Sequence, residues 1–299
     1  MFFNLFNCVV SPAEIGYHIA SKGIFKGDGM IFYFSGTGNS LYVAREIASA
    51  LRDEARSIPQ AIHDASKVYE GERIGIVAPL YGYDVPEMVK RFMREATFDT
   101  GYLFFVFTYG NRHGICSELA CSRMASRGQE VAYTATIIMV DNWLPGFDMD
   151  RQRMEDKGIE GNLDAIVSDL RGKVRRIERA TEADRAEFAE YLELGIEYSG
   201  EALQGFLHMV GERCVGCGTC TRVCPAGCIA LKDGRAQRDS IAGLGCNGCL
   251  ACIHACPAHA IEMELPEINP AARFRNEHVG IAELMEANSQ YNSINQERL

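Results

Sequence analysis

The sequence has no excess of basic residues, and this lack excludes one broad class of function. Of its 299 residues, 30 are Lys or Arg and 40 are Asp or Glu, which gives a formal net charge of -10 at pH 7. Nonspecific nucleic-acid binding needs an electropositive surface. The charge balance therefore argues against a nucleic-acid partner. Many acidic residues lie between about 148 and 208, where a solvated helix face or a docking surface for a basic redox partner are the two interpretations.

The chain also lacks a secretory leader or a long apolar run. Met1–Val10 is apolar, but it has no basic residue and is too short to span a bilayer. We therefore expect a cytoplasmic protein with no membrane insertion. Residues 1–29 are predicted to be an N-terminal extension. Residues 26–29 can be encoded by a purine-rich run that resembles a ribosome-binding site, so Met30 is an alternative start of the natural chain.

Cysteine, in contrast, is abundant and regularly spaced. Eight of the 12 Cys form two copies of a C-x2-C-x2-C-x3-C-P run, at residues 214–225 and 246–257. In such a run three thiolates hold three corners of a [4Fe-4S] cube, and the fourth Cys binds the other cube. By that rule one cluster has the ligands Cys214, Cys217, Cys220 and Cys256, and the second has Cys246, Cys249, Cys252 and Cys224.

Zinc and disulfides are the alternative uses of such cysteines. A structural zinc site takes two Cys-x2-4-Cys hooks per metal, which fits a run of four Cys less well than a cube. Disulfides are disfavoured by the missing leader and by the regular spacing. Residues 211–264 resemble a bacterial two-[4Fe-4S] ferredoxin domain. The other cysteines are expected to be reduced thiols in apolar surroundings: Cys8, Cys116, Cys121 and Cys228. His254 and His259 are expected to pack beside the clusters.

A second motif lies near the start of the chain. The apolar run Met30–Phe34 predicts a strand, and the apolar spacing over residues 41–51 predicts a helix. The loop between them reads Ser35, Gly36, Thr37, Gly38, Asn39 and Ser40. A strand, a loop of Gly and hydroxyl residues and a helix together form a phosphate site, although a plain Gly-Ser turn is the simpler alternative. The loop contains no basic residue and is neither a Walker A motif nor a G-x-G-x-x-G motif.

This loop resembles the flavodoxin phosphate loop, [ST]-x-T-G-[NT]-[ST], which receives the phosphate of FMN. Further apolar strands are predicted at residues 73–79, 102–108 and 131–140, each followed by a helix or a polar loop. Near-continuous apolar strands that alternate with helices predict an α/β fold with a doubly wound parallel sheet, in which ligands bind at the carboxyl ends of the strands. The resemblance implies flavin contacts from the loops after these strands, by Tyr81, Gly82, Tyr109, Gly110 and Asn111.

The remaining segments carry weaker signals. Residues 30–147 are predicted to form the flavodoxin-like domain. Trp143 either covers the flavin pocket or lies in the core, and the core is the favoured position. Residues 148–210 are predicted to be a helical linker with two amphipathic helices and a break near Ser199. The tail, residues 265–299, is expected to dock through Phe274 and Ile281.

The order of these parts resembles the flavodoxin–ferredoxin fusion family of anaerobic bacteria and archaea. The resemblance implies an electron-transfer protein that passes low-potential electrons between FMN, two [4Fe-4S] clusters and an external redox partner protein. An FMN-dependent reductase of a small substrate is the alternative, with Tyr83, Asp84 and His113 as its only candidate catalytic residues. A redox sensor or scaffold with a vestigial flavin site is a third.

Overall fold

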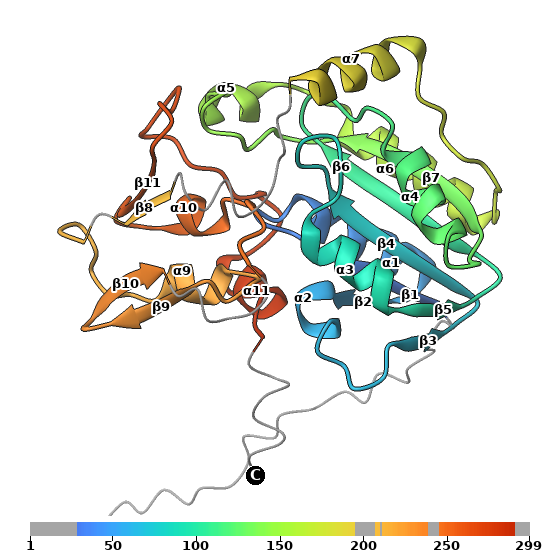
Figure 1. The fold of residues 1–299 in the computed structure, drawn as a ribbon, viewed down its shortest axis with the longest axis horizontal. Helices are drawn as coiled ribbons and strands as arrows, with labels where there is room; N and C mark the ends of the chain where they lie inside the picture. The colour runs from blue at the N-terminus through green and yellow to red at the C-terminus, as the bar shows by residue number, and fades with distance from the viewer. Residues whose placement is uncertain (1–28, 195–206, 210, 239–244, 291–299) are drawn as a thin grey trace, which may run out of the picture.

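The computed structural model describes residues 29–194, 207–209, 211–238 and 245–290 of the chain. A larger part is built on a five-stranded sheet, and a smaller part beside it holds two antiparallel pairs of strands (Figure 1). The predicted N-terminal extension up to residue 28, Cys8 and the predicted helix break near Ser199 lie outside the described residues.

The five-stranded sheet is parallel throughout, with the strand order β2-β1-β4-β6-β7. Its strands are β1 (Gly29–Tyr33), β2 (Glu54–Ser57), β4 (Arg73–Pro79), β6 (Leu103–Tyr109) and β7 (Val131–Ile138). The direction of winding reverses between β1 and β4, which is the arrangement of the flavodoxin-like sheet. The predicted α/β fold is confirmed. A short parallel pair, β3 (Val68–Glu70) and β5 (Thr97–Asp99), adjoins it.

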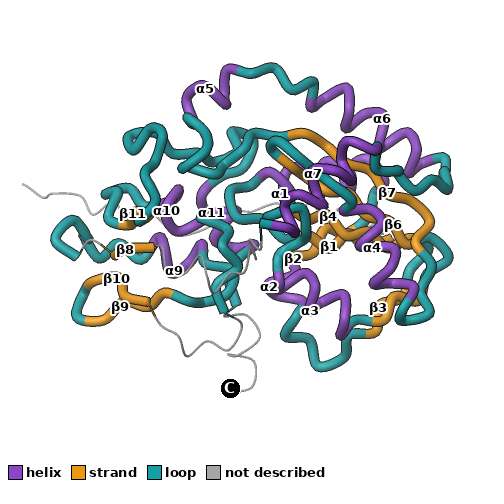
Figure 2. The backbone as a smooth tube through the Cα atoms, turned by 45° about the horizontal axis from the view of Figure 1, so that its top comes forward, coloured by secondary structure: helices purple, strands orange, loops and turns teal. Residues whose placement is uncertain are grey.

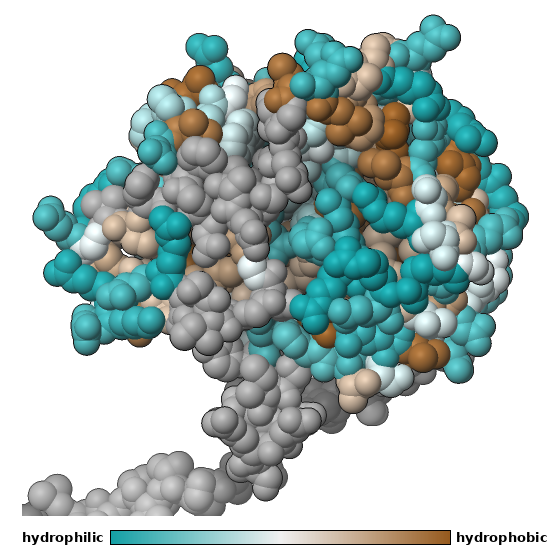
Figure 3. All heavy atoms as spheres, viewed as in Figure 1, coloured by the Kyte–Doolittle hydropathy of each residue, from teal (hydrophilic) through white to brown (hydrophobic). Residues whose placement is uncertain are grey.

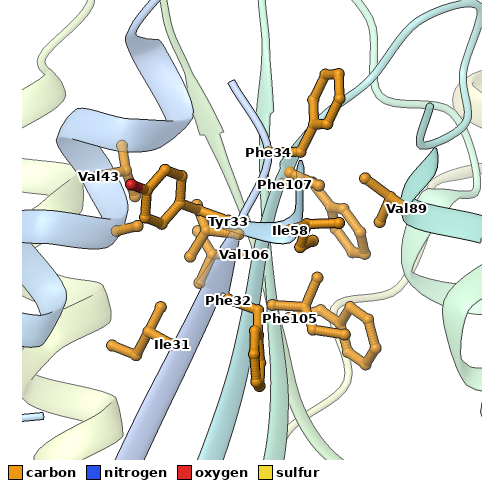
Figure 4. Packing of buried hydrophobic residues seen from close by; sticks show 14 of the residues in the cluster. Ile31, Phe32, Tyr33, Phe34, Val43, Ile58, Val89, Phe105, Val106 and Phe107 are labelled. Atoms are coloured by element: carbon orange, nitrogen blue, oxygen red, sulfur yellow. The ribbon is translucent and has the colours of Figure 1, made fainter. Parts of the chain in front are cut away.

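Both faces of this sheet are buried because its strands are apolar at almost every position. Side chains of a strand alternate between the two faces, so Tyr33 and Val106 point towards Val43 while Phe105 and Phe107 point towards Val89 (Figure 4). These side chains are at most 8% exposed. The strand pattern read from the sequence is therefore that of a sheet covered on two sides.

Helices cover the two faces in the way that a doubly wound fold requires. One face carries α1 (Asn39–Leu51) and α6 (Ile159–Arg171), and the other carries α2 (Ile58–Ala61), α3 (Glu87–Glu95) and α4 (Cys116–Ala125) (Figure 2). The packing of α6 differs from the predicted bridge between domains. Its apolar stripe, which includes Leu163 and Leu170, is buried in the core shared with the sheet.

The other helices of the predicted linker are more exposed. They are α5 (Met149–Met154) and α7 (Glu182–Glu193), and α7 begins with a capping box formed by Thr181 and Asp184. The second amphipathic helix was predicted from Phe188, Leu192, Ile196, Leu203 and Phe206, and the last three lie outside the described residues. In α7 no residue is fully buried and Leu192 is 59% exposed. The helix is held instead by polar pairs and by aromatic contacts with one loop.

The smaller part has two similar halves. It contains β8 (Leu207–Met209), α9 (Thr219–Val223), β9 (Ile229–Lys232), β10 (Arg235–Arg238), α10 (Ala251–Ala255) and β11 (Ile261–Met263). Strand β9 pairs with β10 and β8 with β11, both antiparallel. The tail adds α11 (Ile281–Ala287). Phe274 is buried as predicted, whereas Ile281 is 36% exposed, so the burial expected of it is wrong.

Hydrogen bonds join the smaller part and the tail to the larger part. The amide oxygen of Asn247 accepts from the backbone N–H of Met88 at 2.8 Å. Asn288 of the tail donates from Nδ2 to the carbonyl oxygens of Ser35 and Val223, at 3.1 and 3.0 Å. All of these atoms lie in buried or partly buried surroundings. Of the helices described here, none is long and apolar enough to cross a membrane.

Candidate functional site

A cavity of about 390 Å³ lies at the carboxyl ends of β1, β4, β6 and β7. The loops after these four strands form its wall, because the carboxyl ends of parallel strands meet at one edge. Ten of the eleven predicted flavin residues line it: Ser35, Gly36, Thr37, Asn39, Ser40, Tyr81, Gly82, Tyr109, Gly110 and Asn111. Its volume lies within the range of small-molecule and cofactor sites.

Gly38, the eleventh, shapes the loop from behind. Its φ of 102° is in the left-handed region, and its N–H donates to Ser35 Oγ at 3.0 Å. Its carbonyl then accepts from the N–H of Tyr42 at 2.9 Å, which begins α1. This geometry leaves the first N–H groups of α1 and the hydroxyls of the loop as donors at the cavity, and a phosphate group fits such a neutral donor set.

The segment after β7 contributes more of the wall than the sequence indicated. Asp141, Asn142, Trp143 and Phe147 all line the cavity. The core was the favoured position for Trp143, but the residue is only partly buried and lines the cavity, which was the alternative. Asn142 donates from Nδ2 to Thr37 Oγ1 at 2.8 Å. The signal for these residues was their position directly after a core strand, where doubly wound folds place ligand contacts.

Burial disfavours the charged form of two side chains in the cavity wall, Asp141 and Tyr109. It raises the pKa of Asp141, whose carboxylate accepts from the backbone N–H of Trp143 at 2.9 Å. Burial likewise raises the pKa of Tyr109. Both shifts come from the loss of hydration, which penalises the charged form of an acid.

The eight motif cysteines line two further cavities, four in each. One contains Cys214, Cys217, Cys220 and Cys256 in its wall, and the other contains Cys224, Cys246, Cys249 and Cys252. These are the two crossed sets expected from the spacing. Among the described residues no group of three or more His, Cys, Asp or Glu has the geometry of a single-ion site. Four cysteines in the wall of one cavity are the number and kind of ligand that a [4Fe-4S] cube takes.

Backbone N–H groups point at several of these sulfurs. Cys214 Sγ accepts from Ala236 at 3.3 Å, and Cys256 Sγ accepts from Ala260 at 3.2 Å. In the other set, Cys224 Sγ accepts from the N–H of Cys228 at 3.2 Å. Such donors stabilise thiolate charge and tune iron–sulfur potentials. Cys228 is therefore a neighbour of the second set, as predicted; it and Cys116 are buried, and Cys121 is partly buried.

The second cysteine set lies against the phosphate loop. A Cβ atom added to Gly36 would be 2.6 Å from the carbonyl oxygen of Cys249 and 2.9 Å from its Cβ. Gly248 and Leu250, which precede and follow Cys249 in the sequence, line the cavity of the phosphate loop. Leu250 adopts a left-handed φ of 56° and is only 3% exposed. The cavity therefore has one wall from the smaller part of the protein.

His254 ties three segments together beside this wall. Its Nδ1 accepts from the N–H of Phe274 at 3.1 Å, so Nε2 carries the proton and donates to the carbonyl of Asn142 at 2.9 Å. Burial lowers its pKa to about 4. The neutral ring thus links α10, the tail and the loop after β7. His254 has the packing role that was predicted for it.

The three candidate catalytic residues are not assembled into an acid–base group. Asp84 forms a bidentate ion pair with Arg123 at 2.8 and 2.5 Å, which occupies its carboxylate. His113 packs edge-on against Tyr109 with ring centroids 5.1 Å apart and does not line the cavity. Tyr83 does line it, and Tyr191 of α7 packs on its ring.

Two family matches explain this pair of sites. A flavodoxin domain matches residues 30–115, and a 4Fe-4S dicluster domain matches residues 208–257. The chain joins a flavodoxin domain to a 4Fe-4S dicluster domain. This confirms the predicted resemblance to flavodoxin–ferredoxin fusions, with FMN and two [4Fe-4S] clusters as the cofactors that the domains imply. The chain is an FMN and iron–sulfur redox protein.

Solved structures are similar to the flavodoxin domain at low identity. Two-electron-reduced flavodoxin from Megasphaera elsdenii is 21% identical, with 36% of this chain and 84% of that chain covered and a TM-score of 0.29. An NAD(P)H:quinone oxidoreductase from Methanothermobacter marburgensis is 11% identical, with 50% and 97% covered and a TM-score of 0.28. No curated protein matches the chain. The two family matches alone carry the assignment.

Proposed function

We propose that this protein is an internal electron relay, in which the FMN site exchanges electrons with the second cysteine set, and the first set exchanges them with an external redox protein. The observation that carries the proposal is the contact of the phosphate loop with Cys249, together with Gly248 and Leu250 in the wall of the flavin cavity. Flavins exchange one or two electrons and each cube exchanges one, so the bound groups supply the redox chemistry.

The residues of the chain supply positions and exclude water. Cys249 and Cys252, both 8% exposed, hold the second set in the interior, and Leu250 covers the side towards the flavin cavity. His254 of α10 donates to the carbonyl of Asn142, and Asn142 donates to Thr37, so the loop after β7 is held against both α10 and the phosphate loop. We infer that these contacts keep the distance between the two cofactor sites constant, since a packed interface allows little movement.

The uneven exposure of the two cysteine sets supports their order in the relay. The second set touches the flavodoxin domain, whereas Cys217 of the first set is exposed to solvent. An external protein has closer access to the first set for this reason. We propose that the four cysteines of each set are the ligands of one cluster, and replacement of Cys224 tests this assignment.

The reductase alternative receives less support. Asp84 is occupied by Arg123, and His113 lies off the cavity wall. We therefore propose the carrier function in preference to turnover of a small substrate.

The decisive experiment is anaerobic photoreduction of the holoprotein with fewer electrons than it can accept, followed by rapid absorbance measurements of flavin and clusters. An internal relay predicts that the electrons redistribute with a first-order rate that does not change with protein concentration. A rate proportional to concentration would mean that electrons pass between molecules, and the proposal would be wrong. Consumption of a small acceptor in repeated turnovers would instead support the reductase.

A further inference from the structure

The two cysteine runs of the dicluster domain fold with the same local backbone. Left-handed φ angles occur at matching positions: 70° at Gly216 and 64° at Gly248, and 72° at Gly218 and 56° at Leu250. Matching residues of the two runs, 32 positions apart, therefore occupy equivalent places around their cysteine sets. Any difference in exposure between them comes from their surroundings.

These surroundings differ sharply. Asn247 is 4% exposed because it contacts α3 of the flavodoxin domain, whereas Val215, its counterpart, is 71% exposed. His254 is 8% exposed and bonded to Asn142, whereas its counterpart Arg222 is exposed. The face of the second run is thus an interface inside the molecule. The equivalent face of the first run is open.

The open face has an apolar centre. Val215 and Leu231 are 71% and 43% exposed, and both line the cavity of the first cysteine set. Cys217 is exposed between them in the chain. Exposed apolar side chains next to a redox site are typical of a protein-binding surface.

Basic residues lie in the segments that form this centre, in contrast with the acidic chain. Between residues 211 and 238 there are two exposed acidic residues, Glu212 and Asp233, and five exposed basic ones. Of the basic ones, Arg213 pairs with Glu262 and Arg238 lines the cavity of the second cysteine set, so Arg222, Lys232 and Arg235 supply the basic charge here. The last two belong to the hairpin of β9 and β10, which lies on the side of the dicluster domain that points away from the five-stranded sheet (Figure 1). Hydrophilic side chains cover that edge of the molecule (Figure 3).

We propose that this face is the docking surface for a small electron-carrier protein with an acidic contact face. We call it the basic docking face and define it by Val215, Cys217, Arg222, Leu231 and Arg235. The proposal rests on the relay function proposed above and specifies its external partner. Complementary charge speeds encounter and orients two proteins, and the apolar centre excludes water from the contact. The docked proteins exchange one electron: the donor is oxidised, the acceptor is reduced, and no bond or proton changes.

Binding of a purified acidic ferredoxin to the anaerobic holoprotein tests the proposal. The parent protein is compared with two variants by titration with this probe at low and at physiological ionic strength. Val215→Glu introduces a negative charge into the apolar centre, and Arg222→Glu reverses a positive one. We expect each variant to raise the dissociation constant about tenfold at low salt. The difference should shrink at about 0.15 M salt, where the Debye length falls to about 8 Å. Val68→Glu is the matched control, since Val68 is 56% exposed on the flavodoxin domain.

Other outcomes overturn the docking face. Unchanged affinity in both variants, with iron and flavin content equal to the parent protein, would show that the carrier binds elsewhere. Tighter binding of a basic c-type cytochrome than of the acidic ferredoxin would show that the partner has the opposite charge. Concentration-dependent dimers that Val215→Glu abolishes would assign the face to a second copy of the chain. First-order electron redistribution within the protein stays intact in all three cases, so these results are distinct from a failure of the relay.

Discussion

Replacement of Gly36 by Ala tests the contact between the phosphate loop and the second cysteine set. The backbone of Gly36 is not left-handed, so alanine fits its local conformation. The new methyl group would be 2.6 Å from the carbonyl oxygen of Cys249, 2.9 Å from its Cβ and 3.1 Å from the hydroxyl of Tyr81. Two of these atoms cannot rotate away, because a carbonyl and a Cβ are fixed by the backbone.

The magnitude follows from these distances. Ordinary contacts of a carbon begin near 3.5 Å, so the loop and Cys249 must separate by roughly 1 Å. Overpacking of a close contact costs about 1–3 kcal/mol. For a chain of this size that corresponds to a decrease of roughly 2–5 °C in the thermal midpoint. We expect full iron content, flavin retained at saturating FMN, and slower first-order electron redistribution.

Calorimetry and the photoreduction experiment measure these two effects. Gly161→Ala is the control, because a Cβ atom at this exposed position of α6 meets no atom within 4 Å. The control should redistribute electrons as the parent protein does. If Gly36→Ala has the thermal midpoint and the redistribution rate of the control, the phosphate loop does not touch Cys249 and the proposed path is wrong.

Three further substitutions separate the cofactor sites. Gly38→Val forces a β-branched residue into a φ of 102°, so FMN affinity should fall at least about tenfold while iron content is unchanged; equal flavin content would contradict the assigned loop. Cys224→Ser should remove the cluster bound by residues 246–252 and spare the other, as iron counts and electron paramagnetic resonance would report. Leu250→Gly relieves about 1–2 kcal/mol of left-handed strain but removes a buried side chain worth about 3–5 kcal/mol, so the thermal midpoint should decrease; an increase would mean that strain exceeds packing.

Local patterns in the sequence predicted the core of each half. The strands at residues 73–79 and 131–140 were placed to within two residues, because a strand buried on both faces is apolar at nearly every position. The loop from Ser35 to Ser40 and the eight cysteines were found because their chemistry needs fixed residue types at short spacing. Each of these motifs spans fewer than about 15 residues, so it can be recognised in the sequence without knowledge of the fold.

Patterns failed where burial depends on a distant partner. The core was the favoured position for Trp143, which lies at the cavity, and Ile281 was expected to be buried and is exposed. Helix α6 was expected to bridge the domains, yet it covers the sheet. An apolar residue or stripe predicts burial in general, but the sequence does not say which surface covers it.

The sequence by itself determined which cofactors this protein binds and which residues are candidates to hold them. Only the tertiary structure decided that the second cysteine set, and not the first, faces the flavin cavity. The two runs are nearly identical as motifs, so no local rule distinguishes them. Their difference arises from contacts between residues more than a hundred positions apart, such as Asn247 with Met88 and His254 with Asn142, which exist only in the folded chain.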